Sequence, residues 1–148
     1  MSLIAIAGTN ALYRLLDPRL SGHASHRKAL AGISHLVVSP MVLAELDHLV
    51  ATRAGADKAV MAARFVERHV VTRRFEVPSV GEHLSAAIAV AEGYRDTDGG
   101  EGIGLTDAMN VALAAAYRTE AMFTSDAHFR MIRPLTGHKA FRLLPEDL

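Results

Sequence analysis

Short apolar segments that alternate with longer helical patterns limit most strongly what this chain can fold into. In the stretches between these segments, apolar residues recur at the spacing of one helix face. Strands that are joined through helices run parallel, and a parallel sheet is covered by helices on both faces. We expect one α/β domain over residues 1–148, with a central, mainly parallel sheet of about five strands, at residues 3–7, 35–39, 73–78, 121–125 and 140–145.

The stretches between these strands predict helices and one long loop. Ser39 and Pro40 are typical of an N-cap and a first helical position, and Gly55 is typical of the residue that ends a helix. The polar, glycine-rich residues 95–104 predict a loop. Helices are expected over residues 10–17, 24–33, 40–54, 57–70, 80–94, 105–120 and 126–132.

Charge and cysteine content exclude several classes of protein. The 16 Lys and Arg residues balance 16 Asp and Glu residues, so no net charge draws the whole chain to nucleic acid or to a membrane surface. The sequence has no Cys, which excludes disulfides, thiolate metal sites and a Cys nucleophile. No apolar stretch approaches the ~20 residues of a membrane span, and the N-terminal apolar run is too short for a signal peptide. We expect a cytoplasmic protein that does not enter a membrane.

The residues beside the predicted strand ends indicate where a site would form. Ligands of open parallel sheets bind beyond the carboxyl ends of the strands. Glu45 lies early in the helix after the second strand, Asp107 begins the helix before the fourth, and Asp126 directly follows the fourth. Thr9 and Asn10 follow the first strand. We therefore expect the three carboxylates to converge at one edge of the sheet.

A divalent cation would stabilise three converging carboxylates. A partly buried carboxylate is costly without compensation, and neighbouring carboxylates raise its pKa by repulsion. Hard oxygen ligands, with neither Cys nor clustered His, favour Mg²⁺ or Mn²⁺ over Zn²⁺. Such a site can activate water and shield phosphate charge, which is the chemistry of phosphodiester hydrolysis.

Each of these residues also has a purely structural explanation. Asp107 and Asp126 begin predicted helices, where Asp caps backbone N–H groups and interacts favourably with the helix dipole. Glu45 could instead form an ion pair with His48 or an Arg. Their shared position at one edge of the sheet, rather than any single residue, indicates a metal site.

Four segments occur in order along nearly the whole chain: TNALYRLL, VVSPMVLAELDHLV, IGLTDAMNVALA and MFTSDAHFRMI. In this order they resemble PIN-domain ribonucleases, in particular the toxins of VapBC-type toxin–antitoxin pairs. The resemblance implies a three-layer α/β/α fold and a Mg²⁺- or Mn²⁺-dependent endoribonuclease. It also implies an RNA substrate, a cognate antitoxin protein as partner and, together with the Met and Leu residues on several helices, a homodimer.

The resemblance assigns roles to individual residues as well. The catalytic, metal-binding carboxylates would be Glu45, Asp107 and Asp126. Asn110 shares the helix face of Asp107, three residues further on. The residues expected to support the site are Thr9, Asn10, Asn110 and Thr124.

Gly8 departs from the family pattern, which has Asp at the end of the first strand and reads DTNAL where this chain reads GTNAL. One of four expected metal ligands is therefore missing, and Asp17 lies too far along the first helix to replace it. We expect a weakened metal site. We also expect the backbone to tolerate Asp at this position, because the end of a buried strand does not need the conformational freedom of glycine.

Three interpretations remain open at this point. The first is a metal-dependent ribonuclease toxin, in which Asp96, Asp98 or Glu101 of the glycine-rich loop could assist the metal. The second is a catalytically inactive PIN-like module that binds RNA or a protein partner. The third is a flavodoxin-like protein that binds phosphate at the sequence GTN, although the Lys of a P-loop is absent. Metal titration distinguishes the first interpretation from the others.

Overall fold

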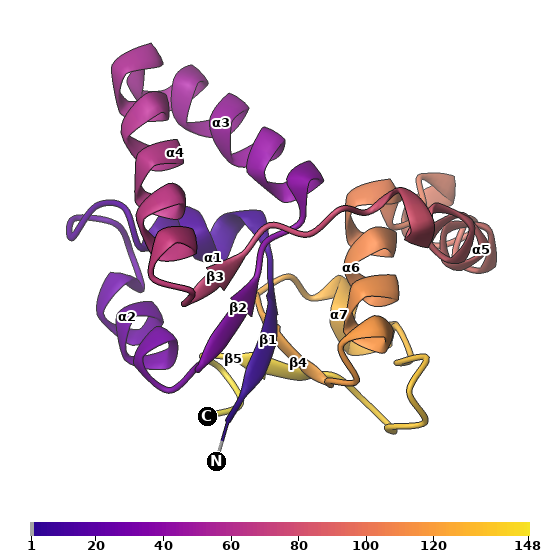
Figure 1. The fold of residues 1–148 in the computed structure, drawn as a ribbon. Coiled ribbons are helices and arrows are strands. Elements are labelled where there is room, and N and C mark those ends of the chain that lie inside the picture. The colour runs from indigo at the N-terminus through magenta and orange to yellow at the C-terminus, as the bar shows by residue number, and fades with distance from the viewer. Residues whose placement is uncertain (1) are drawn as a thin grey trace.

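The computed structural model describes residues 2–148 and contains one sheet of five parallel strands, as the sequence predicted. The strand order is β3-β2-β1-β4-β5, so the first strand of the chain is the central one (Figure 1). The strands are β1 (Ile4–Ala7), β2 (His35–Val37), β3 (Phe75–Glu76), β4 (Ala121–Phe123) and β5 (Arg142–Leu144).

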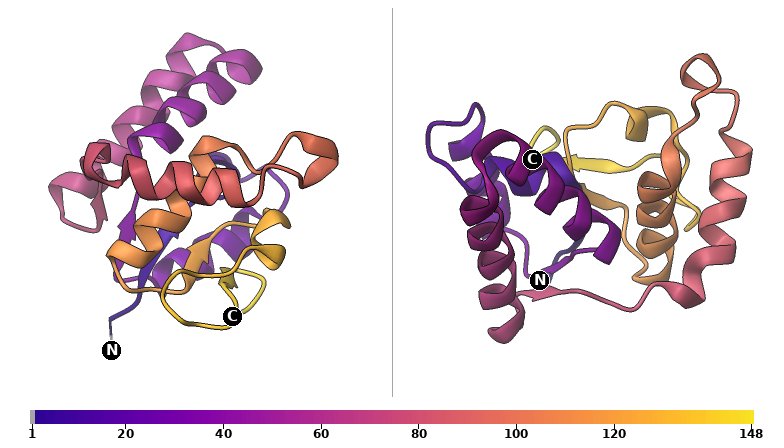
Figure 2. Two further views of the ribbon diagram at one scale, coloured as in Figure 1. Left: turned by 90° about the vertical axis from the view of Figure 1, so that its right-hand side faces the viewer. Right: turned by 90° about the horizontal axis from the view of Figure 1, so that it is seen from above.

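Helices cover both faces of this sheet and complete a three-layer α/β/α arrangement. One face carries α1 (Thr9–Arg14), α2 (His23–Ala31), α3 (Pro40–Ala54) and α4 (Ala56–Val71). The other face carries α5 (Leu84–Gly93), α6 (Gly104–Ala116) and α7 (His128–Met131). Figure 2 shows the α3–α4 pair and the α5–α6 pair on opposite sides of the strands. Two short 3₁₀ segments, Gly81–His83 and Asp98–Gly100, precede α5 and α6.

Alternation along the buried strands produces two hydrophobic cores. In β1, Ala5 and Ala7 face α1 to α4, whereas Ile6 between them faces α5 to α7. In β4, Phe123 and Met122 divide between the two cores in the same way. Strands β1 and β4 are apolar on both faces for this reason and read as continuous apolar runs in the sequence.

Local hydrogen bonds set the helix boundaries. The Ser39 hydroxyl accepts a hydrogen bond from the Met41 N–H at 3.1 Å, which confirms the predicted N-cap of α3. Helix α1 ends at Arg14, three residues earlier than expected, because Leu15 and Leu16 donate to carbonyls three residues back. Residues 2–148 contain no helix that is long and apolar enough to cross a membrane.

The centre of the sheet is also a topological switch point. Strand β1 pairs with β2 on one side and with β4 on the other, so the connections after β1 and β4 leave the sheet toward opposite faces. At such a point the strand ends separate two layers of helices and leave room for a ligand. Thr9 follows β1 and Asp126 follows β4, whereas Glu45 lies in α3 after β2 and Asp107 lies in α6 before β4.

Candidate metal centre

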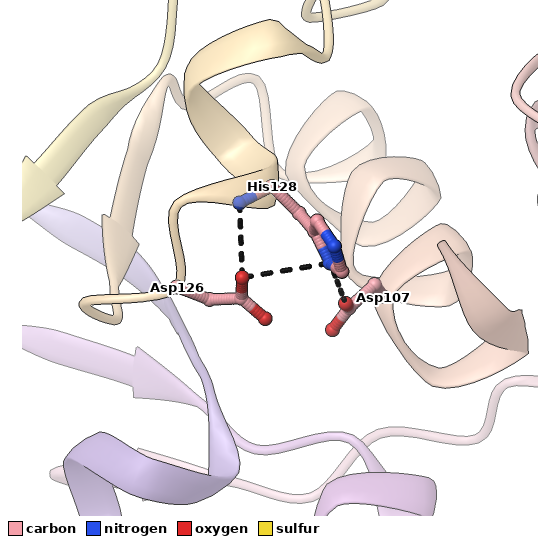
Figure 3. Close-up of side chains that lie close together, drawn as sticks. All are labelled: Asp107, Asp126 and His128. Carbon is pink, nitrogen blue, oxygen red and sulfur yellow. Dashed lines mark hydrogen bonds and ion pairs between the residues drawn. The ribbon is translucent and has the colours of Figure 1, made fainter. Parts of the chain in front are cut away.

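Asp107 and Asp126, two of the three carboxylates expected to converge, approach each other at the carboxyl edge of the sheet. Asp107 comes from the first turn of α6, and Asp126 lies shortly after β4, beyond Thr124 and Ser125. His128 lies between them: its Nδ1 is 3.7 Å from Asp107 Oδ2 and 3.5 Å from Asp126 Oδ1 (Figure 3). One ligand atom from each of the three residues lies within 4.8 Å of the others.

The electrostatics of Asp107 show that a third carboxylate is near. Burial, followed by the negative charges of Asp126 and Glu45, raises the pKa of Asp107 to about 6. His128 lowers the pKa of Asp107, but by less than burial and the two carboxylates together raise it. Asp107 is therefore a carboxylate whose charge the protein alone does not compensate at neutral pH.

Glu45 lies beside the Asp107–Asp126–His128 cluster rather than within it. Its Oε1 accepts a hydrogen bond from the Thr9 hydroxyl at 2.7 Å, which joins the start of α1 to α3. Thr9, Asn10 and His48 share a shallow depression with Glu45. Within residues 2–148, the Asn10 side chain makes no hydrogen bond in this structure and is exposed to solvent.

Thr124 and Asn110 hold the backbone beneath the carboxylates. The Thr124 hydroxyl accepts a hydrogen bond from the Asp126 N–H at 3.1 Å, and Asp126 Oδ1 in turn accepts one from the His128 N–H at 2.9 Å. These bonds delay the start of α7 to His128, two residues later than expected. Buried Asn110 donates from its side chain to the Ala7 carbonyl at 3.2 Å, which fixes the end of β1 against α6.

We expect Asn110→Leu to destabilise the protein although it keeps the size of the side chain. The substitution leaves the Ala7 carbonyl buried without its donor, and an unsatisfied buried polar group costs about 1–3 kcal/mol. Urea denaturation measures the difference in the free energy of unfolding. An unchanged denaturation midpoint would show that this hydrogen bond does not hold β1 against α6.

Gly8 has an ordinary backbone conformation but little space for a side chain. Its φ of −96° and ψ of 159° are accessible to any residue, in line with the expectation from the sequence. A Cβ atom added here would lie 2.8 Å from Thr124 Oγ1 and 3.0 Å from Thr124 Cβ. The glycine is therefore closely packed against the residue that supports Asp126, so Asp at this position requires β1 and β4 to adjust locally.

His128 is the residue of this cluster that the sequence analysis did not identify. The sequence signal for it was the segment Asp126-Ala127-His128 shortly after the fourth strand. A turn at this point brings His128, two residues further on, back toward Asp126. Of the three acidic residues considered in the glycine-rich loop, Asp98 approaches the cluster, with Oδ2 3.6 Å from His128 Nε2. No ion pair of Asp96 or Glu101 with the cluster occurs within residues 2–148.

The donor set fits a divalent cation. Ligands on opposite sides of one small cation are about 4 Å apart, which is similar to the separation of the ligand atoms in this cluster. A cation would also compensate the charge of Asp107, whose pKa is raised by burial and by two neighbouring carboxylates. Asp107 and Asp126 are the residues placed to hold it, with Glu45 beside them.

A parallel sheet with acidic residues at its switch point is the architecture of the PIN domain. The chain matches the PIN-domain family over residues 8–133 and belongs to this family. It is 36% identical to Ribonuclease VapC26 of Mycobacterium tuberculosis (strain ATCC 25618 / H37Rv), over 143 residues that cover 95% of this chain and 99% of that protein. The resemblance to VapC proteins is thereby confirmed.

Solved structures share the fold at lower sequence identity. The crystal structure of VapC20 from Mycobacterium tuberculosis, a Sarcin-Ricin loop cleaving toxin, has a TM-score of 0.67 and 20% identity, and the match covers 84% of this chain and 90% of that one. VapBC2 from Rickettsia felis, bound to a DNA fragment from its promoter, has a TM-score of 0.63 and 19% identity, with coverage of 90% and 96%. A toxin–antitoxin complex from Klebsiella pneumoniae has a TM-score of 0.56 and 18% identity, with coverage of 83% and 87%.

Proposed function

We propose that this protein is an endoribonuclease that depends on Mg²⁺ or Mn²⁺ and acts as the toxin of a toxin–antitoxin pair. The observation that carries the proposal is the convergence of Asp107 and Asp126, with Glu45 close enough for its charge to raise the pKa of Asp107. The relationship to a protein named a ribonuclease, over nearly the full length of both chains, supports the same reaction.

Each side chain of the site has a separate role in the proposed reaction. A bound Mg²⁺ or Mn²⁺ would supply positive charge for a phosphate and lower the pKa of a water molecule. Asp107 and Asp126 hold the cation, and both stay partly exposed, so an RNA phosphate can reach it. Thr9 fixes the Glu45 carboxylate at the rim. Thr124 orients Asp126 through its backbone.

The nuclease proposal is tested by incubating the purified chain with structured RNA in Mg²⁺, in Mn²⁺ and in EDTA. We expect slow cleavage that requires the metal, because one family carboxylate is missing at Gly8. Asp126→Asn should lower cleavage at least about a hundredfold, since it removes a direct ligand, and loss of an outer contact alone costs about 10–100-fold. Equal cleavage in EDTA, or by Asp126→Asn, would refute the proposal.

A catalytically inactive module that binds RNA or a protein is the second candidate. The observation that favours it is Gly8, which lacks the carboxylate and is packed against Thr124. This candidate predicts that the chain binds RNA or an antitoxin in gel-shift or pull-down experiments but cleaves no RNA with either metal. Cleavage that Asp126→Asn abolishes would exclude it.

An antitoxin segment has a suitable surface on this chain. Apolar side chains of α1, α3 and α4 line a groove, and basic residues border it. The apolar lining includes Tyr13, Leu16, Val50, Met61 and Phe65. Lys58 and Arg68 add positive charge, whereas Arg19 is paired at 2.8 Å with Asp17, which also lines the groove. We propose that the cognate antitoxin inserts an apolar segment with acidic residues here. The VapBC2 and Klebsiella pneumoniae structures are consistent with an antitoxin as the partner.

We expect the chain to form a homodimer. Apolar residues that are exposed on α5, such as Leu84 and Ile88, would be covered by a second copy. Light scattering at micromolar concentration should give twice the mass of one chain, and Ile88→Glu should reduce that mass toward the monomer. A monomer at this concentration without any substitution would contradict the expectation.

A further inference from the structure

The His128 ring is placed differently from the other histidines of the chain, because each of its nitrogens faces a carboxylate. Nδ1 faces Asp107 and Asp126 (Figure 3). Nε2 faces Asp98. Nδ1 is buried and has no hydrogen-bond partner within residues 2–148. A buried polar nitrogen without a partner is costly, so its position beside two carboxylates needs an explanation.

The position of Asp98 supplies the second part of the argument. Imidazoles that bind metals generally direct their other nitrogen at a carboxylate, a carbonyl or a water, which orients the ring. Asp98 Oδ2 lies 3.6 Å from Nε2 and comes from the loop before α6, whereas His128 comes from α7. Nε2 therefore faces a carboxylate outside the cluster, at a distance longer than a hydrogen bond, while Nδ1 faces the carboxylates inside it.

We propose that His128 Nδ1 is a direct metal ligand and that Asp98 orients the ring from the other side. This inference rests on the proposed metal-dependent function and deepens it. The cation would then have two carboxylates and one imidazole as its nearest ligands, in place of the carboxylate that Gly8 cannot provide. Glu45, which is held by Thr9, would lie outside this set.

An imidazole ligand changes the preferred metal. Mg²⁺ favours oxygen ligands, whereas transition metals accept imidazole readily. We therefore expect the preference of this chain for Mn²⁺ over Mg²⁺ to be stronger than that of a site made of carboxylates alone. His128→Gln should lower the Mn²⁺ affinity by at least about tenfold and the Mg²⁺ affinity by less. Asp98→Asn should weaken Mn²⁺ binding through loss of ring orientation, without removing the nitrogen ligand.

Pulsed electron paramagnetic resonance of the Mn²⁺-loaded full chain tests this ligand assignment without measuring catalysis. Modulation from a directly coordinated ¹⁴N should be present in the unmodified protein and in Asp98→Asn, and absent in His128→Gln. His138→Gln is the matched control, because His138 also lies beside a carboxylate, Glu120, at 3.2 Å but away from the site. Thermal melts in EDTA verify that each variant folds.

The possible outcomes separate this inference from the proposed function. Bound Mn²⁺ without nitrogen modulation would overturn the role of His128 and leave a carboxylate-only nuclease site. Nitrogen modulation that persists in His128→Gln would overturn it as well. If a Mn²⁺ titration showed no binding to the unmodified chain, both the inference and the proposed metal-dependent function would fail.

Discussion

Gly8→Asp should tighten Mg²⁺ or Mn²⁺ binding and raise RNA cleavage by more than about tenfold, because even indirect metal contacts change affinity by about 10–100-fold. The substitution adds a carboxylate at the end of β1, beside Thr124, which supports Asp126. The backbone conformation of residue 8 permits Asp. Expression of this variant without an antitoxin should also be toxic to the host.

Because Thr124 crowds residue 8, the Gly8→Asp experiment needs control variants that separate crowding from charge. Any Cβ here meets Thr124 Oγ1 at 2.8 Å, so the metal-free variant should be less stable by roughly 1–3 kcal/mol, as for other overpacked sites. Gly8→Ala has the same Cβ and measures this cost by thermal melting. Gly8→Asn has nearly the shape of Asp but no charge. If Gly8→Asn cleaved RNA as fast as Gly8→Asp, the missing carboxylate at residue 8 would not be what limits cleavage.

Asp107→Asn should abolish cleavage and stabilise the metal-free protein. Asp107 is one of the two carboxylates placed to hold the cation, so its loss should lower cleavage at least about a hundredfold. The same residue destabilises the metal-free protein at neutral pH, because burial, Asp126 and Glu45 raise its pKa to about 6. In EDTA at pH 7, we expect Asp107→Asn to raise the free energy of unfolding by on the order of 1–2 kcal/mol.

The pH dependence of this stability difference follows from the direction of the pKa shift. The folded protein binds the Asp107 proton more tightly than the unfolded chain, where the pKa is near the ordinary value of 3.8. The stabilisation from this proton is complete below about pH 4 and is lost as the pH rises through about 6. Urea denaturation in EDTA should therefore show the advantage of Asp107→Asn shrinking between pH 7 and pH 4. A constant difference would contradict the raised pKa.

The order and type of the main elements were predictable because their causes are local. Alternating apolar runs and helical patterns identify all five strands, and Ser39 and Gly55 mark the ends of α3 as predicted. The exact lengths depend on contacts that the sequence does not display. Strand β3 contains two residues instead of six. Helix α6 ends at Ala116, four residues early, where Arg118 adopts a left-handed conformation with φ of 55°.

The site was predictable only in part. Asp107, Asp126 and Glu45 could be assigned to one edge because the topology of a parallel sheet determines where the ends of its strands lie. The positions of His128 and Asp98 depend on a two-residue turn and on a glycine-rich loop, whose conformations do not follow from residue spacing. The crowding of Gly8 by Thr124 depends on the distance between two neighbouring strands, which sequence patterns do not specify.

The pairing of β1 with β4 also determines when the centre of the sheet can be completed during synthesis. Ile6 pairs with Met122, although most of the chain lies between them. The ribosome therefore releases β1 long before its central partner exists, and Asp126 and His128 emerge only after β4. Pairing across such a distance is slow to form. A chain that ends before residue 121 lacks both Asp126 and His128 as well as β4, and we expect it not to cut RNA even if the complete protein does.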